Sequence, residues 1–128
     1  MSELAIISET GMFHSLCRCT YVAEVDWYGF APIQKGSPHG PGAVHREARP
    51  ELINHIITFD VPELTLRAAM AEVSAKYAHA IYTVTVRDCV SFTADVARAV
   101  GLRAPYVNFT PWGLIQALRL YNAYKTVN

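Results

Sequence analysis

Cys89 is the residue of this chain best placed for covalent chemistry. It follows Asp88, a residue type favoured at helix N-caps, and apolar side chains at Phe92 and Val96 then recur at helical spacing until Gly101. Unpaired backbone N–H groups and the helix dipole at such a first turn favour a thiolate, which is the nucleophile of cysteine hydrolases. The same N–H groups could hold a developing oxyanion. This position therefore predicts acyl transfer through a cysteine.

His14 is the candidate base for this nucleophile. It lies in strand-like sequence, and in cysteine enzymes the partner histidine is distant in the chain but near in space. Both residues also have ordinary interpretations: a free cysteine usually packs as a small hydrophobic residue, and a histidine between apolar neighbours as a satisfied core residue. His39 and His45, in a Pro/Gly-rich tract, give weaker signals.

A metal site is the lesser alternative for the segment around His14. His14, Cys17 and Cys19 form the pattern HxxCxC, but alternation along a strand places the two cysteines on one face and His14 on the other. No second Cys/His pair with zinc-finger spacing follows, so we expect no metal and no cofactor. Three cysteines cannot all pair, and a disulfide between Cys17 and Cys19 would be strained, so we predict a reduced chain.

Composition excludes several function classes. The chain has 128 residues, the size of one domain, so residues 1–128 are expected to fold as a single unit. Eleven basic residues balance eleven acidic ones, which argues against nucleic acid as a partner. No apolar run is long enough for a transmembrane helix, and the N-terminus lacks the basic start of a signal peptide. We therefore expect a protein that is cytoplasmic as made, or exported by a signal-independent secretion route.

The hydrophobic pattern predicts an α+β fold. Strand-like segments at 4–8, 13–22, 25–30 and 53–61 make an N-terminal antiparallel meander, with a Pro/Gly-rich loop over 32–50. A helix with an Asp60–Glu63 capping box and a buried face of Leu66, Met70, Val73 and Tyr77 follows. A strand over 80–86 comes next, then the Cys89 helix, and then a helix opened by Thr110-Pro111 with Leu114, Leu118 and Tyr121 buried.

These pieces together resemble the circularly permuted papain-like cysteine hydrolases, relatives of the NlpC-type cell-wall peptidases. In the permuted branch the histidine strand precedes the cysteine helix, as it does here. The resemblance spans nearly the whole chain in the expected order, and its matching segments are Gly11-Met12-Phe13-His14-Ser15, Trp27-Tyr28-Gly29-Phe30-Ala31-Pro32, Gly40-Pro41-Gly42, Asp88-Cys89-Val90-Ser91-Phe92, Ala99-Val100-Gly101-Leu102 and Thr110-Pro111-Trp112.

The resemblance implies a role for each site residue. Cys89 would be the nucleophile and His14 its base, and a third polar residue on the neighbouring strand, Asp26 or Glu24, would orient the histidine, with Asp26 matching the spacing better. The Cys89 backbone N–H and a group near Tyr82 would hold the oxyanion. Three aromatic residues are then expected on the substrate side of the site: Tyr28, Tyr82 and Trp112.

Three functions remain open from the sequence. The first is an amidase or peptidase that cleaves a peptide, plausibly a peptidoglycan stem peptide, as an antibacterial effector (toxin) with a cognate inhibitor (immunity) protein. The second is an acyl-lipid hydrolase or acyltransferase of the lecithin:retinol acyltransferase-like branch, for which the aromatic residues Trp27 and Trp112 are the only hint. The third is a non-catalytic binding domain in which Cys89 and His14 are core residues.

Overall fold

The computed structural model describes residues 1–10, 14–84 and 86–128. Its centre is one seven-stranded sheet with the order β6-β4-β3-β2-β1-β5-β7, in which every neighbouring pair is antiparallel. The predicted α+β class with an N-terminal antiparallel meander is thereby confirmed. The strands are β1 (Ser2–Glu9), β2 (Ser15–Thr20), β3 (Val25–Pro32), β4 (His39–His45), β5 (Ile53–Val61), β6 (Ile81–Thr83) and β7 (Thr126–Val127).

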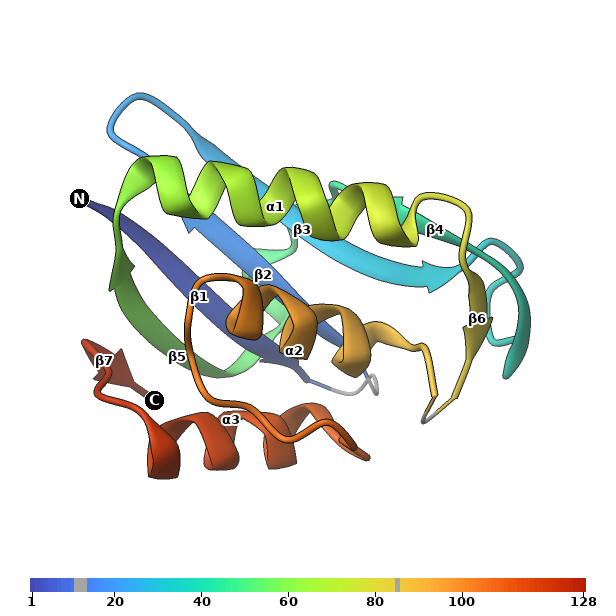
Figure 1. Cartoon of the computed structure of the whole chain (residues 1–128). Helices are drawn as coiled ribbons and strands as arrows, with labels where there is room; N and C mark the ends of the chain where they lie inside the picture. Colours follow the sequence, from blue (N-terminus) through green and yellow to red (C-terminus); the bar gives the residue numbers. More distant parts are fainter. Residues whose placement is uncertain (11–13, 85) are drawn as a thin grey trace.

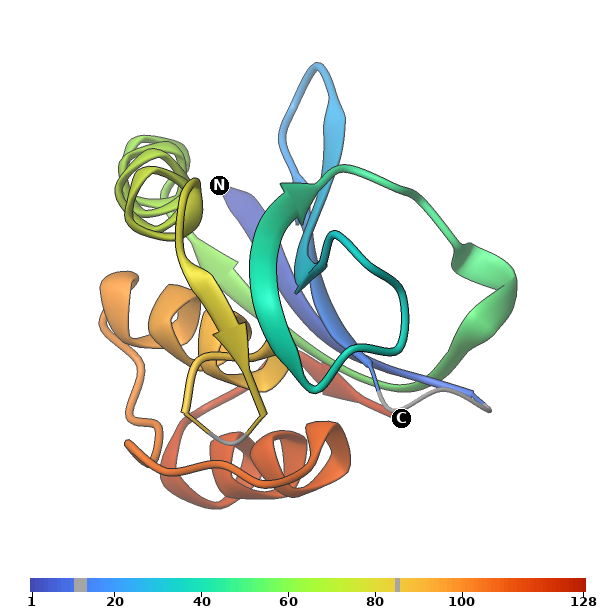
Figure 2. The same ribbon diagram turned by 90° about the vertical axis from the view of Figure 1, so that its right-hand side faces the viewer.

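Three helices lie across one face of this sheet (Figure 1). They are α1 (Glu63–Tyr77), α2 (Cys89–Ala99) and α3 (Pro111–Tyr121), and a single 3-10 turn, η1 (Pro50–Leu52), precedes β5. The sheet is strongly curved (Figure 2), and its β4 strand lies next to the C-terminal end of α1, where the Gly42 N–H donates to the Ala80 carbonyl at 3.1 Å. A smaller apolar cluster that contains Ala5, Ile7 and Leu16 lies on the face away from the helices. The apolar side chains of β1 and β2 therefore form two separate clusters, one on each face of the sheet.

Three aromatic rings from three elements pack against one another in the main core. Phe30 of β3 meets Tyr77 of α1 edge to face at 4.9 Å between ring centroids, and Tyr77 meets Phe92 of α2 in the same way at 5.2 Å. Such pairs contribute about 0.5–1.5 kcal/mol each beyond the burial of their area. The Tyr77 hydroxyl also donates to Asp95 of α2 at 2.6 Å, which ties the C-terminal end of α1 to α2.

The structure corrects the expected loop over 32–50, because this segment contains β4. Packing requires a glycine at one position of β4 and at one position of the neighbouring β3. A Cβ atom on Gly42 would lie 2.3 Å from the Phe30 ring, and one on Gly29 would lie 2.4 Å from the His45 ring. Pairing with β3 on one side and β6 on the other supplies the backbone hydrogen bonds that stabilise β4.

Several smaller expectations also change. The predicted capping box is wrong: α1 has Pro62 at its N-cap without a side-chain hydrogen bond, and Asp60 lies in β5. Among the described residues of the strand expected over 80–86, Ile81–Thr83 form β6, and Thr85 lies outside the described residues. Tyr121 is exposed rather than buried. The other expected apolar faces of α1 and α3 are buried. The part of the predicted 13–22 strand at Phe13, like Gly11 and Met12 of the resemblance, lies outside the described residues.

Candidate active site around Cys89

Cys89 occupies the first position of α2, as its sequence context predicts. Asp88 is the N-cap, and its Oδ1 atom accepts hydrogen bonds from the backbone N–H groups of Val90 at 3.1 Å and Ser91 at 3.0 Å. The helix ends with Gly101 in a left-handed conformation at φ +95°, which also fits its predicted place. The Asp88 side chain caps one end of α2, and Gly101 ends the helix at the other. Because both ends of α2 are defined in this way, the helix holds Cys89 at a fixed place against the sheet.

The sulfur of Cys89 lies among polar groups although the residue is only 1% exposed. The backbone N–H of Ser15, at the start of β2, donates to it, and the N–H groups of Val90 and of Cys89 itself lie close enough to stabilise a negative charge on it. The Tyr82 hydroxyl of β6 hydrogen-bonds to the same thiol and accepts from the Cys89 N–H. Three elements thus converge on one sulfur atom, and two of them carry residues predicted for the site.

Burial nevertheless dominates the electrostatics of this thiol. Desolvation raises its pKa, the Asp88 carboxylate raises it further, and the three N–H groups only partly offset these effects, so that the pKa reaches about 11. An ordinary thiol has a pKa of about 8.5. In the resting structure Cys89 is therefore a neutral thiol, and a base would have to remove its proton.

His14 and Ser15 sit side by side at the start of β2 but face opposite ways. The Ser15 hydroxyl is 2.8 Å from the Thr93 hydroxyl of α2, on the helix side of the sheet. The His14 ring lies over Gly29 on the other side, where its Nε2 atom is 3.1 Å from Nε2 of His45. The structure therefore brings the amide next to His14 onto the sulfur, and it brings the His14 imidazole onto His45.

The hydrogen bonds of this histidine pair also indicate where the protons lie. The Glu47 backbone N–H donates to Nδ1 of His45 at 3.4 Å, which leaves the His45 proton on Nε2 as the donor to His14. A neutral His14 that accepts at Nε2 carries its own proton on Nδ1, the nitrogen nearer the backbone. The lone pair of His14 is therefore on Nε2, where it accepts from His45, and His14 can act as a base only when this hydrogen bond is broken.

A buried ion pair adds positive charge beside the two histidines. Arg49, which precedes η1, lies with a terminal nitrogen 3.2 Å from Glu9, whose side chain is fully buried. Burial lowers the pKa of His14 most, and the charges of His45 and Arg49 lower it further, to about 3. The pKa of His45 is lowered by burial and by Arg49 as well. Both imidazoles are therefore neutral at neutral pH.

We expect this arrangement to make the fold sensitive to acid. The pKa of His14 is about 3 in the folded chain and about 6.5 when unfolded, so the unfolded chain binds more protons between these values. Stability is then fully present above pH 6.5 and falls as the pH drops towards 3. The slope that His14 contributes within this window is about 1.4 kcal/mol per pH unit. Urea unfolding of wild type and of His14→Gln across the window measures it.

The comparison between variants isolates His14 from its neighbours. His45 titrates in the same direction, whereas the raised pKa of Glu9 acts in the opposite one, so the absolute curve mixes several groups. His14→Gln should lose stability less steeply in acid than wild type, while His79→Gln, at an exposed position after α1, should follow wild type. Equal slopes for wild type and His14→Gln would contradict the neutral, buried state of His14.

Other residues predicted for the site lie elsewhere. Asp26 pairs with Cys19 in the β2–β3 register and forms an ion pair with Arg46 at 3.2 Å. That position is five residues along β2 from His14, or roughly 16 Å at strand spacing, so the structure does not bring Asp26 to His14. Glu24 forms an ion pair with Arg67 of α1 instead.

The predicted substrate-side aromatics are not all together either. Tyr82 contacts Cys89, as described above. Tyr28 lies under the Arg46 guanidinium at 4.0 Å and lines a cavity of about 240 Å³ between β3 and α1. Trp112, at the start of α3, stacks on His55 of β5 with 3.7 Å between ring centroids. The structure thus brings Tyr82 to the thiol, whereas Tyr28 and Trp112 contact Arg46 and His55.

His45 is the site residue that sequence reasoning missed. It contacts His14 where an orienting residue is needed, but its tract was read as a loop because of its prolines and glycines. One signal was available: Val44 and His45 follow the glycines as an apolar–polar pair, which is the pattern of a half-buried strand. A run of two residues is too short to distinguish a strand from a loop.

The structure and the comparisons add two further findings. Within residues 1–10, 14–84 and 86–128, no helix has the length and apolar character needed to cross a bilayer. In comparisons with known proteins, no family model matches this chain, and no curated protein and no solved structure matches it.

Proposed function

We propose that this protein is a cysteine hydrolase of permuted papain-like type that cleaves an amide bond in a peptide, with the peptidoglycan stem peptide as the expected substrate class. One observation carries the proposal: the Ser15 amide, directly after His14, donates to the sulfur of Cys89. This contact joins the start of β2 to the start of α2 across 74 residues of the chain, at Cys89 and at the residue next to His14.

The reaction uses groups that surround the sulfur. The thiol proton passes to Nε2 of His14, the nitrogen that carries no proton in the resting tautomer, while sulfur attacks the amide carbonyl, and the oxyanion is stabilised by the Cys89 N–H and the Tyr82 hydroxyl. His14 then gives the proton to the leaving amine, and water hydrolyses the thioester in the second half-reaction. His45, rather than Asp26, holds the His14 imidazole before substrate binds.

The mechanism requires a movement of the His14 side chain. Its imidazole contacts His45 in the resting structure and has to approach the sulfur when substrate binds. Catalytic hydrogen bonds are often long or misaligned before substrate binding and shorten only in the complex. A neutral thiol and a neutral imidazole that face opposite ways fit a resting site that is activated by substrate rather than a preformed ion pair.

A covalent intermediate provides the direct test. The protein is mixed with stem-peptide fragments and with a matching peptide thioester, quenched in acid, digested and analysed by mass spectrometry. We expect the mass of the acyl group on the peptide that contains Cys89, and none on the peptides that contain Cys17 or Cys19, which are buried in the core. Acylation of all three cysteines or of none, with no cleaved peptide released, would contradict the proposal.

A further inference from the structure

The charges of the chain are unevenly distributed although its net charge is zero. Residues 96–128 carry four basic residues and no acidic one, whereas the rest of the chain carries seven basic residues against eleven acidic ones. Arg98 and Lys125 of this region are held by carboxylates, Asp95 for the first and Glu3 and Asp60 for the second. Arg103 and Arg119 remain as exposed basic residues of the C-terminal region.

The same region exposes half of its large apolar side chains. Tyr106 is 88% exposed, Leu120 74% and Phe109 65%. These three, with Val107, Trp112 and Tyr121, are here called the C-terminal apolar surface. Contiguous apolar patches are uncommon on monomeric soluble proteins and mark contact with another protein or with a membrane.

The fold holds the two parts of this surface side by side. The segment 102–110 runs along α3 in the opposite direction (Figure 1). The Arg103 N–H donates to the Asn122 side chain at 2.8 Å, and Asn122 donates back to the Arg103 carbonyl at 2.8 Å, which ties the segment to the end of α3. On its inner side α3 buries Leu114, Ile115 and Leu118, so the residues it exposes are not needed for the core.

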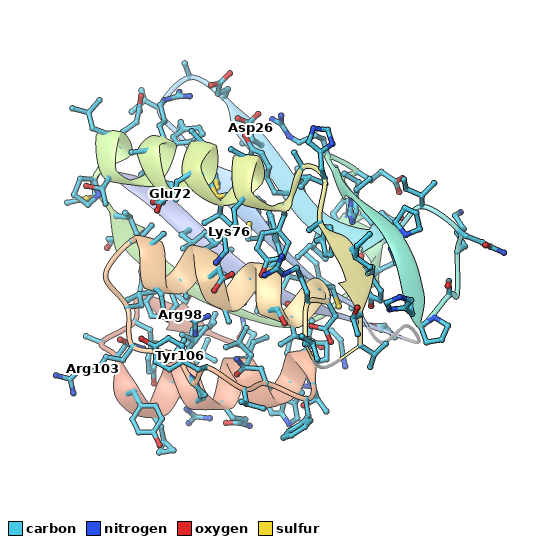
Figure 3. All side chains as sticks on the ribbon, turned by 45° about the vertical axis from the view of Figure 1, so that its right-hand side comes forward. Asp26, Glu72, Lys76, Arg98, Arg103 and Tyr106 are labelled. Carbon is cyan, nitrogen blue, oxygen red and sulfur yellow. The ribbon has the colours of Figure 1, made fainter. Side chains whose placement is uncertain are left out.

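One basic side chain of this region, Arg98, lies against an exposed ring. Figure 3 shows Arg103 projecting away from the fold, with Tyr106 near Arg98. The Arg98 guanidinium stacks on the Tyr106 ring at 4.6 Å from its centroid and also donates to the Pro105 carbonyl at 2.7 Å. This contact holds the segment 102–110 with Tyr106 at its outer edge.

We propose that the C-terminal apolar surface docks onto an anionic lipid bilayer. Trp and Tyr side chains concentrate at the headgroup level of membranes, and basic residues next to them attract anionic lipids. Charge complementarity favours this occupant over a second copy of the chain, because two copies joined through this surface would bring their uncompensated arginines together. The inference does not depend on the proposed hydrolase activity, since Cys89 is buried at the start of α2.

Flotation with lipid vesicles tests the docking. Wild type is mixed at low salt with vesicles of phosphatidylcholine alone or of an equal mixture with phosphatidylglycerol. We expect binding to the anionic vesicles to exceed binding to the neutral ones by about tenfold or more, and to fall as salt screens the charges. Tyr106→Ser with Phe109→Ser should remove most of this binding, and Arg103→Gln with Arg119→Gln should remove the preference for anionic vesicles.

Matched controls distinguish binding through this surface from nonspecific adsorption through exposed apolar side chains. Val22→Ser with Ile33→Ser changes two equally exposed apolar residues outside the C-terminal region and should bind as wild type does. Cys89→Ala should also bind normally, which separates this proposal from the hydrolase. The docking proposal is overturned if wild type ignores anionic vesicles, if the Tyr106/Phe109 variant binds as wild type does, or if that variant instead loses a dimer seen by analytical ultracentrifugation.

Discussion

Cys89→Ala is expected to lower the rate of peptide cleavage by about 10³-fold or more, because it removes the atom that forms the covalent intermediate. The remaining groups at the site, the Ser15 and Cys89 N–H groups and the Tyr82 hydroxyl, would still bind the substrate and its oxyanion. The residual rate of the variant is then the acceleration that substrate binding and electrostatic stabilisation alone provide. Release of peptide fragments, followed by chromatography and mass spectrometry, measures the loss.

Cys17→Ala is the matched control for this variant. It is the same chemical change at another fully buried cysteine, and it leaves the start of α2 untouched. Both variants are expected to lose some stability because each leaves a small cavity, but only Cys89→Ala should lose turnover. Equal turnover in the two variants would show that Cys89 is a packing residue and would favour the non-catalytic binding domain.

The parts of the site that the sequence predicts are those specified by local signals. The Asp88 cap, the apolar stripe of α2 and the Gly101 stop all lie within fourteen residues, and together they place Cys89 on the first turn. The helix faces of α1 and α3 follow from periodicity in the same way, apart from Tyr121. Such features depend on short-range contacts and need no knowledge of the tertiary fold.

The parts that the sequence does not predict depend on long-range packing. β4 contains Gly40, Pro41 and Gly42, which have low strand propensity, and it exists because β3 and β6 pair with it on both sides. The partner of His14 follows from that pairing, since Gly29 leaves the space in which His14 and His45 meet. Asp26 was chosen by its spacing along the chain, but strand register, not spacing, decides which residues are neighbours.

His14→Ala has the second large expected effect, a decrease of about 10²–10⁴-fold in kcat/KM, the usual contribution of a general base. A neutral thiol with a pKa near 11 cannot supply enough thiolate by itself at neutral pH. His79→Gln, at an exposed position, is the control and should retain wild-type turnover. A wild-type rate for His14→Ala would mean that another group takes the proton.

The pH profile distinguishes a base from a residue that only supports the fold. His14 must be neutral to accept the proton, so activity is lost as the pH falls through its folded pKa, which burial and the charges of His45 and Arg49 lower to about 3. Activity should therefore persist well below pH 6.5, as far into acid as circular dichroism shows the chain to be folded. Arg49→Gln removes one of those charges, which raises the pKa of His14 and moves the acid limb of kcat/KM to higher pH. A structural role for His14 would leave the position of that limb unchanged, because no catalytic proton would then depend on the charge of Arg49.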